Sequence, residues 1–337
     1  MNDANLVLKW LGIHDPVPQY IYILSSLYRG GDRRKLGMKN PKCMVKLQFL
    51  IMITLVVQTF PVRILALGGP PYPSASWSAN GGRQGELASY GCEASADKTT
   101  GMIYGLAYTG VTSGSAWAYA WSNMIDYYST GSAQTISKET LFRILSKLHD
   151  NENMDFLKGI MANLDSTLEV TKDESIRNEI KKAKEFFYKS ILEDKIPPQI
   201  DAEEMTKKES QRIGSSGTKV AYATVYLDGA IDRFTPYIPP FLIGYWSYYH
   251  RIIVYLRIYD STTGSQVAGD IRVFSEVASY STYVSLSTTW NAQSGHSYVI
   301  IAGMRAECSL SGYGNYMATV NVVFTRNSHV TYISVQG

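Results

Sequence analysis

The chain has 337 residues, of which 32 are Lys or Arg and 29 are Asp or Glu, and its formal net charge at pH 7 is +3. Nine of the basic but only three of the acidic residues precede Leu67, so the remainder carries 23 basic and 26 acidic residues, a net charge of about −3. This balance excludes the clustered basic charge of a nucleic-acid-binding surface.

The N-terminal region predicts export. An uncharged run at 47–60 follows Lys42 and Lys46. It suits the apolar part of a signal peptide and falls short of the ~20 residues that a membrane-spanning helix needs. We therefore interpret residues 44–67 as a cleaved signal peptide; an uncleaved membrane anchor and a buried helix are the alternatives. The predicted location is extracellular or on the cell surface, with membrane contact only through this segment if it stays uncleaved.

Residues 1–43 need a separate interpretation, because a signal is read as the chain emerges and a long leader is unusual. Met38 and Met44 both lie just ahead of the apolar run. We interpret residues 1–43 as upstream sequence included by a wrong start in a prokaryotic gene. The alternative is a cytoplasmic tail, since seven basic against three acidic residues also fit the positive-inside rule.

Charged residues divide the rest of the chain into two kinds of structure. Residues 136–213 contain 30 charged residues, whereas residues 68–135 and 214–337 together contain only 19 but carry 21 of the 25 tyrosines. The charged middle segment is therefore predicted to be a helical insertion between two parts of one domain.

The flanking segments predict β-strands. Short runs rich in Tyr, Val, Ile and Thr are separated by Gly, Ser, Asn and Asp, and residues alternate in character at 118–121 and 252–258. Eight or more strands with hairpin spacing predict one antiparallel β-sandwich or jelly-roll-like domain, formed by residues 68–135 and 214–337.

Two tight turns are predicted from a repeated pattern. Residues 97–101 and 260–264 both read Asp-x-Thr-Thr-Gly. The Asp side chain can close an Asx turn and the Gly can take a positive φ.

The middle segment predicts three or four amphipathic helices. Apolar residues recur three and four positions apart over 141–168, and Thr171 with Glu174 forms a capping box that opens a helix to about Asp194. Residues 149–155 resemble a calcium loop but lack its Gly and terminal acid, so we interpret them as a polar connection between two helices. The helices either fold onto the sheet or project from it as a small bundle. The inward residues of the last long helix are predicted to be Ile176, Ile180, Ala183, Phe187 and Ile191.

The sequence contains no nucleophile elbow, P-loop, HExxH or CxxC motif, so no cofactor or metal ion is predicted. His250, His296 and His329 do not stand at ligand spacing with one another. The weak catalytic candidates are Glu93 and Glu307. They would approach each other if the neighbouring cysteines paired, as the two carboxylates of a glycoside hydrolase do.

Cys92 and Cys308 are the only cysteines beyond the signal segment. Two cysteines in an exported chain are more often paired than free, so we predict a Cys92–Cys308 disulfide. Such a bond would tie the first strand region to the last.

An aromatic stretch at 237–249 is the most unusual feature of the sequence. Prolines interrupt any strand there, so a loop is predicted to carry Phe241, Tyr245 and Trp246 as binding residues. Exposed aromatic side chains stack on sugars or bury in a protein partner. The alternative is that they cover the end of the sandwich.

The sequence favours a non-enzymatic, exported surface protein that serves in adhesion or structural assembly. Its expected partners are further copies of itself, other surface proteins or a polysaccharide. In the assembly hypothesis residues 68–85, which have no core of their own, form a mobile arm that adds to the sheet edge of a neighbour. The alternative is a glycan-binding module that uses the aromatic loop, and a secreted glycoside hydrolase is the third hypothesis.

Overall fold

The structure is a computed structural model that describes residues 68–131, 136–202, 212–237 and 244–337. All of them lie in the unit Ala66–Gly337. The segments 1–43 and 44–67, interpreted above as leader and signal peptide, lie outside the described residues.

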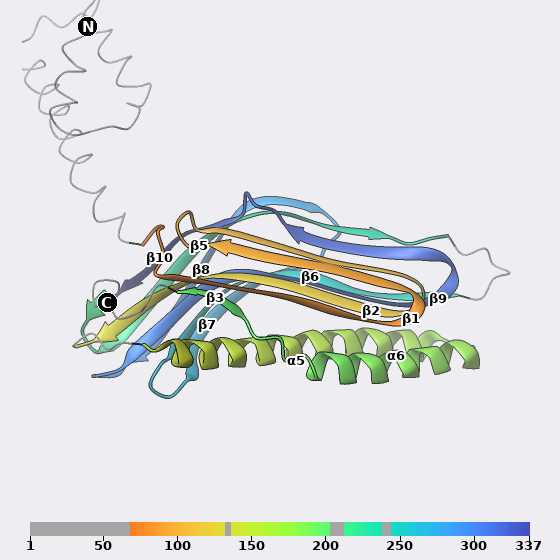
Figure 1. The fold of residues 1–337 in the computed structure, drawn as a ribbon, viewed down its shortest axis with the longest axis horizontal. Coiled ribbons are helices and arrows are strands. Elements are labelled where there is room, and N and C mark those ends of the chain that lie inside the picture. The colour runs from red at the N-terminus through yellow and green to blue at the C-terminus, as the bar shows by residue number, and fades with distance from the viewer. Residues whose placement is uncertain (1–67, 132–135, 203–211, 238–243) are drawn as a thin grey trace, which may run out of the picture. The chain divides into compact units, whose positions relative to one another are not determined.

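The described residues are mainly β, as predicted, and contain two helices where the sequence predicted three or four (Figure 1). The helices are α5 (Lys138–Val170) and α6 (Glu174–Leu192). The strands are β1 (Ser74–Asp97), β2 (Met102–Thr130), β3 (Gln199–Ala202), β4 (Arg212–Gly214), β5 (Gly217–Phe234), β6 (Tyr245–Asp260), β7 (Ser265–Phe274), β8 (Ser279–Ala292), β9 (Ser297–Phe324) and β10 (His329–Gln336).

All ten strands belong to one sheet, in the order β3-β1-β2-β10-β5-β9-β6-β7, with β4 on β2 and β8 on β5. Because β9 also pairs with β2, the sheet closes on itself through β2, β10, β5 and β9. A β-sandwich or jelly roll is not confirmed, because the strands form a single closed sheet and not two separate ones.

Three strands bend sharply and contribute to two layers. The register of β1 and β2 shifts between Gln84 and Ala88, and that of β2 and β9 shifts at 111–113. The β1–β2 hairpin folds back at the bend: Ser122, which follows the bend in β2, donates a hydrogen bond from its Oγ to the carbonyl of Tyr104, which precedes the bend, at 2.7 Å. We call residues 74–84, 113–130 and 297–313, with β6 and β7, the helix-side layer. The remaining parts of β1, β2 and β9, with β5, β8 and β10, form the far layer.

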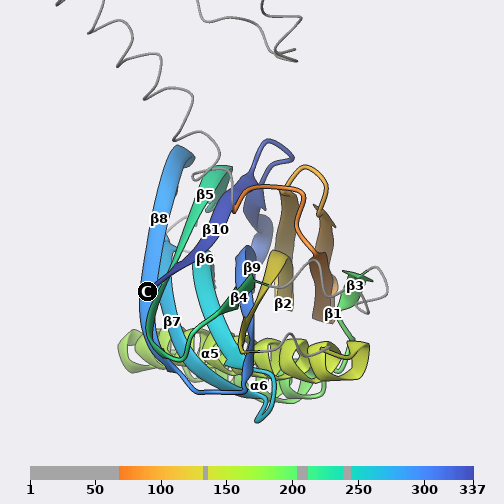
Figure 2. The same cartoon turned by 90° about the vertical axis from the view of Figure 1, so that its left-hand side faces the viewer.

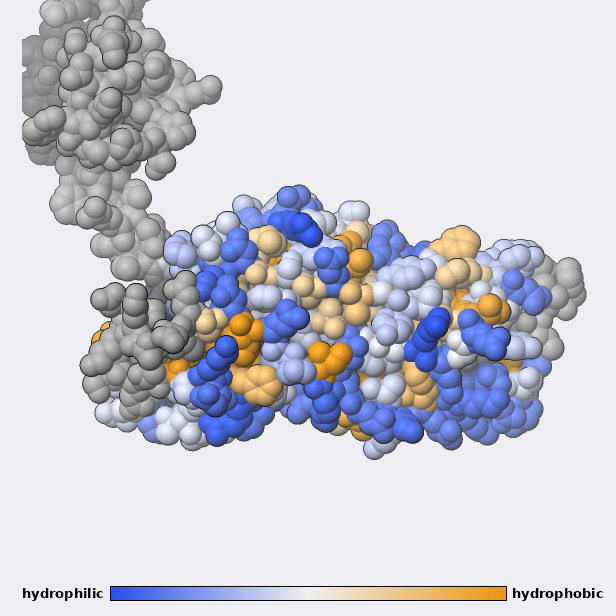
Figure 3. Space-filling model, viewed as in Figure 1, coloured by the Kyte–Doolittle hydropathy of each residue, from blue (hydrophilic) through white to orange (hydrophobic). Residues whose placement is uncertain are grey.

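Two apolar cores lie on opposite faces of the helix-side layer. The alternation at 118–121 sets these faces: Ala118 joins the core between the layers, while Tyr119 and Trp121 join the core beneath the helices. Figure 2 shows the helices on one side of the strands. The helices therefore fold onto the sheet, and Figure 3 shows mainly hydrophilic residues over them.

The helices confirm the predicted inward face and correct the predicted boundaries. The buried residues of α6 are the five that the sequence indicated. However, α6 is capped by Asp173, whose carboxylate accepts hydrogen bonds from two backbone N–H groups, and Thr171 ends α5. Residues 149–155 lie inside α5 and not between two helices. The described part of 136–213 thus holds two helices, with β3 and β4 after them.

The two Asp-x-Thr-Thr-Gly turns are confirmed. The backbone N–H of Thr99 donates to Asp97 Oδ1 at 2.9 Å, and that of Thr262 donates to Asp260 Oδ1 at 2.8 Å. Both glycines have positive φ.

The prediction that residues 68–85 form a mobile arm is wrong for this structure. Residues 74–84 pair with β2 along their whole length, and Ser74 to Trp77 also pair with β3. The backbone of residues 74–84 is therefore hydrogen-bonded within its own sheet. The small residues of this segment suit the closely packed bend.

Candidate functional site

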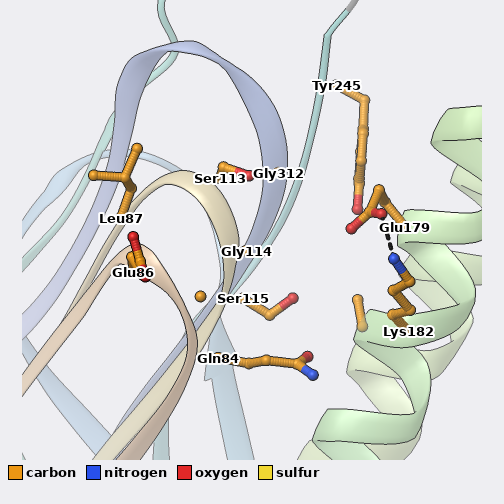
Figure 4. Close-up of a pocket in the computed structure, with 12 residues that line it drawn as sticks. Gln84, Glu86, Leu87, Ser113, Gly114, Ser115, Glu179, Lys182, Tyr245 and Gly312 are labelled. Carbon is orange, nitrogen blue, oxygen red and sulfur yellow. Dashed lines mark hydrogen bonds and ion pairs between the residues drawn. The ribbon is translucent and has the colours of Figure 1, made fainter.

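A cavity of about 390 Å³ lies between the sheet bend and α6, and we call it the bend pocket (Figure 4). The strands β1, β2, β6 and β9 supply one wall and a turn of α6 supplies the other. The lining residues are Gln84, Gly85, Glu86, Leu87, Ser113, Gly114, Ser115, Glu179, Lys182, Ala183, Tyr245 and Gly312.

Glycine makes the bend that forms this pocket. Gly114 has a φ of 123°, a conformation that residues with a Cβ rarely adopt. A Cβ at this position would also overlap the Gln84 carbonyl oxygen of the neighbouring strand. The strands can therefore approach and turn only with Gly here.

Hydroxyl groups line the sheet wall of the pocket. Tyr245 Oη and Ser311 Oγ lie 3.0 Å apart, and Ser115 Oγ donates to Ser311 Oγ at 3.1 Å. Burial raises the pKa of Tyr245 to about 12, and the nearby Glu179 charge acts in the same direction although the Ser311 hydrogen bond opposes it. The phenol is therefore protonated at neutral pH and can both donate and accept.

An ion pair lines the helix wall. Lys182 Nζ lies 2.8 Å from Glu179 Oε1. These side chains project from α6 toward the hydroxyl of Tyr245, as Figure 4 shows. The two opposite charges largely cancel, so the helix wall offers polarity without a net charge.

The predicted aromatic binding residues do not form one exposed group. Tyr245 is 8% exposed and lines the bend pocket. Trp246 is half-buried, and its indole lies against Gly312 and Gly314. Phe241 lies outside the described residues.

The catalytic candidates are separated. Glu93 is exposed and accepts a hydrogen bond from Tyr104 at 3.4 Å. Glu307 is fully buried, where Arg305 Nε donates to its Oε2 at 2.7 Å and Arg251 donates to its Oε1. The structure does not bring the two carboxylates together, because one belongs to the outer face of the far layer and the other to the helix side of the sheet.

The predicted disulfide is not present, since Cys92 and Cys308 are both free thiols. They nevertheless belong to the same core between the layers. Burial raises the pKa of Cys308 to about 12, and the nearby Glu307 and Cys92 act in the same direction. The hydrogen bond from Thr109 lowers this pKa, but by less. Cys308 is therefore an unreactive thiol in the folded protein.

A buried polar cluster, which sequence reasoning missed, joins the helices to the sheet. Tyr119 of β2 donates to Asp194 Oδ2 at 2.7 Å and lies 2.6 Å from His149 Nε2. Asn153 Nδ2 donates to Asp194 Oδ2 at 3.2 Å. We call Tyr119, His149, Asn153 and Asp194 the helix–sheet cluster. Arg305 extends it, because its Nη2 donates to Asn153 Oδ1 at 2.8 Å and its guanidinium lies 4.4 Å from the Tyr119 ring centre.

Asp194 is the anionic centre of this cluster. Burial would raise the pKa of Asp194, but hydrogen bonds from His149, Tyr119 and the Ile196 N–H outweigh it and hold the pKa well below its ordinary range. Helical spacing is the signal that could have found the cluster. His149 and Asn153 follow Leu145 at four-residue intervals, so they continue the inward stripe of α5.

Comparison of the chain with protein-family models, with curated proteins and with solved structures finds no match. Neither α5 nor α6 contains an apolar run of the length that crossing a bilayer requires. Within the described ranges, no three His, Cys, Asp or Glu side chains are grouped to hold a metal ion. Any functional conclusion therefore depends on the geometry of the chain itself.

Proposed function

We propose that the protein is an exported surface protein with a structural assembly role, in which two copies pair through the open edge of β1. One observation carries this proposal. Strand β3 covers β1 only at Ser74 to Trp77, so residues 78–97 have no strand neighbour on their outer side among the described residues.

The composition of this edge favours pairing. Natural edge strands are blocked by charges, by Pro or by being short. Residues 87–96 contain no Pro, and Glu93 is their only charged residue. A second strand can add to such an edge through backbone hydrogen bonds, with little demand on its side chains.

A second copy of the chain is the proposed occupant, paired edge to edge about a two-fold axis. The other end of the strand order is less accessible, because β8 approaches β7 and the Ser287 N–H donates to Asp270 Oδ2 at 3.0 Å. Of these two edges β1 is therefore the open one, and contact between two identical edges closes into a dimer.

The test is sedimentation velocity of the protein over a range of concentrations. We expect a concentration-dependent dimer that is weakened at least about tenfold by Gly91→Lys combined with Ser95→Lys, because lysines on an edge oppose pairing. A Cβ at Gly91 meets no atom within 4 Å, so the fold accommodates the change.

Ala162→Lys with Ser166→Lys is the matched control, since it adds the same charge at exposed positions of α5. A protein that stays monomeric, or a dimer that both double variants weaken equally, would contradict the proposal. Oligomers larger than a dimer would contradict the two-fold pairing.

Export is tested separately, by N-terminal sequencing of the native protein. The basic-apolar-small order of the sequence from Lys42 to Gly69 predicts a first residue between 65 and 71. Native protein that retains peptides from residues 1–37 would refute this processing.

A further inference from the structure

We propose that the bend pocket binds a neutral, polyhydroxylated ligand, namely a mono- or disaccharide unit. This inference does not rest on the proposed dimer, although Gln84, Gly85, Glu86 and Leu87 of the open edge 78–97 also line the pocket. A volume of about 390 Å³ lies within the range of roughly 300–1,000 Å³ that small-molecule sites occupy.

The charges of the pocket disfavour an anionic ligand. Its charged lining residues are Glu86, Glu179 and Lys182, and the last two form an ion pair with each other. Among the described residues that line the pocket, no cation is left over to neutralise a phosphate or a carboxylate, which would have to be desolvated without compensation. The carboxylates can instead accept hydrogen bonds from hydroxyl groups.

The uncharged polar groups suit hydroxyls in particular. Gln84, Ser115 and Tyr245 each carry groups that both donate and accept hydrogen bonds. A sugar hydroxyl also donates and accepts hydrogen bonds. Neighbouring hydroxyls of a sugar therefore match a pocket wall that carries several amide and hydroxyl groups. Figure 4 shows the Gln84 side chain extending across the pocket toward α6, with Ser115 above it.

Tyr245 adds a hydroxyl group and little of its ring, because the residue is only 8% exposed. Its ring is drawn edge-on in Figure 4, between the bend and the helix, with the hydroxyl end toward Glu179. Gly114 and Gly312 belong to the same sheet wall, where the Gln84 carbonyl and Trp246 occupy the space that their side chains would fill.

The test is saturation-transfer NMR and titration calorimetry of the full chain with glucose, galactose, mannose, N-acetylglucosamine and their disaccharides. Glucosamine and glucuronic acid serve as charged analogues. We expect saturable binding of at least one neutral sugar, weakened about fivefold or more by Gln84→Ala and by Ser115→Ala, since each removes a hydrogen bond.

Gln199→Ala and Ser294→Ala are the matched controls, because they remove the same groups at exposed positions outside the pocket. Circular dichroism establishes that each variant is folded. Absence of binding to every neutral sugar, equal weakening in pocket and control variants, or tighter binding of the charged analogues would overturn the proposal.

A second experiment distinguishes binding of a free sugar from binding of a polysaccharide. Retardation of the protein in a native gel that contains the polymer of the bound unit, relieved by the free sugar, supports binding of the polymer. Binding of the sugar without retardation supports the free sugar as ligand.

Discussion

Besides its contact with His149, Asp194 accepts hydrogen bonds from the side chains of Asn80, Tyr119 and Asn153 and from the Ile196 N–H. These groups come from β1, β2, α5 and the segment after α6. A single carboxylate thus connects four parts of the chain. Its side chain is fully buried, so solvent does not screen these contacts.

We expect Asp194→Asn to lower the free energy of unfolding by about 2–3 kcal/mol, because the amide NH₂ cannot accept and would face donor groups. Urea unfolding at pH 7 measures this change. Asp201→Asn, an exposed carboxylate on β3, is the control and should change it by less than about 0.5 kcal/mol.

The same substitution changes the pH dependence. The pKa of Asp194 is lowered in the folded protein, so the unfolded chain takes up the proton first as the pH falls. The stabilisation is therefore complete above about pH 4 and is lost as the pH falls further. The free energies of unfolding of the unchanged protein and of the Asp194→Asn variant should converge as the pH falls from 7 to 3. A difference that stays constant would refute the stabilising role of the Asp194 carboxylate.

At the scale of elements, α6 is held by an apolar face in which Phe187 is the largest side chain. This side chain is fully buried, whereas its neighbour Tyr188 is 61% exposed. Phe187→Ala should destabilise the protein by about 3–5 kcal/mol, because it leaves a cavity between helix and sheet.

Tyr188→Ala removes a side chain of similar size from the solvent face of the same turn, and it should cost less than about 1 kcal/mol. Thermal unfolding of both variants compares them directly. Similar losses in the two would show that α6 packs on a different face.

The helices show how far the sequence predicted the fold. The inward face of α6 followed from spacing alone, because apolar residues that recur every three or four positions have one way to be buried together. The length of α5 was not predicted from the sequence. The polar residues in its middle were interpreted as a connection, because their hydrogen-bond partners Tyr119 and Arg305 belong to the sheet and lie far away in sequence.

The strands and the site show the same limit. Turn residues predicted both Asp-x-Thr-Thr-Gly turns because that chemistry is local. The bend was not predicted, since Gly114 reads as a gap between two short strands and the structure uses it to fold one long strand back. Of the two predicted binding residues that the structure describes, Tyr245 lines the bend pocket and Trp246 does not, and the pocket is assembled from four strands and a helix.

At the scale of the whole molecule, the two cysteines report on the folded-back sheet. Cys308 lies in the helix-side layer, and Thr109 of the far layer donates to its sulfur at 3.7 Å. Alkylation at pH 8 should therefore leave Cys308 unmodified in the folded protein and modify it fully after unfolding in urea, because its pKa is raised to about 12.

Peptide mass spectrometry locates the label, and Cys92, which is only half-buried, is the internal comparison. Rapid labelling of Cys308 in the folded protein would contradict the layered arrangement. Resistance of both thiols in unreduced, urea-unfolded protein would instead establish the disulfide that the sequence predicted.

The position of β9 has a consequence for the order in which the sheet can form. This strand pairs with β2, β5 and β6, all of which precede it in the chain, and its partner residues in β2 are more than 160 positions away. Until β9 is available, each of these three strands lacks a neighbour. Pairing over such distances makes folding slow and leaves strand edges exposed meanwhile. The sheet is therefore completed late, because none of these three strands gains its β9 partner before residues 297–324 have been made.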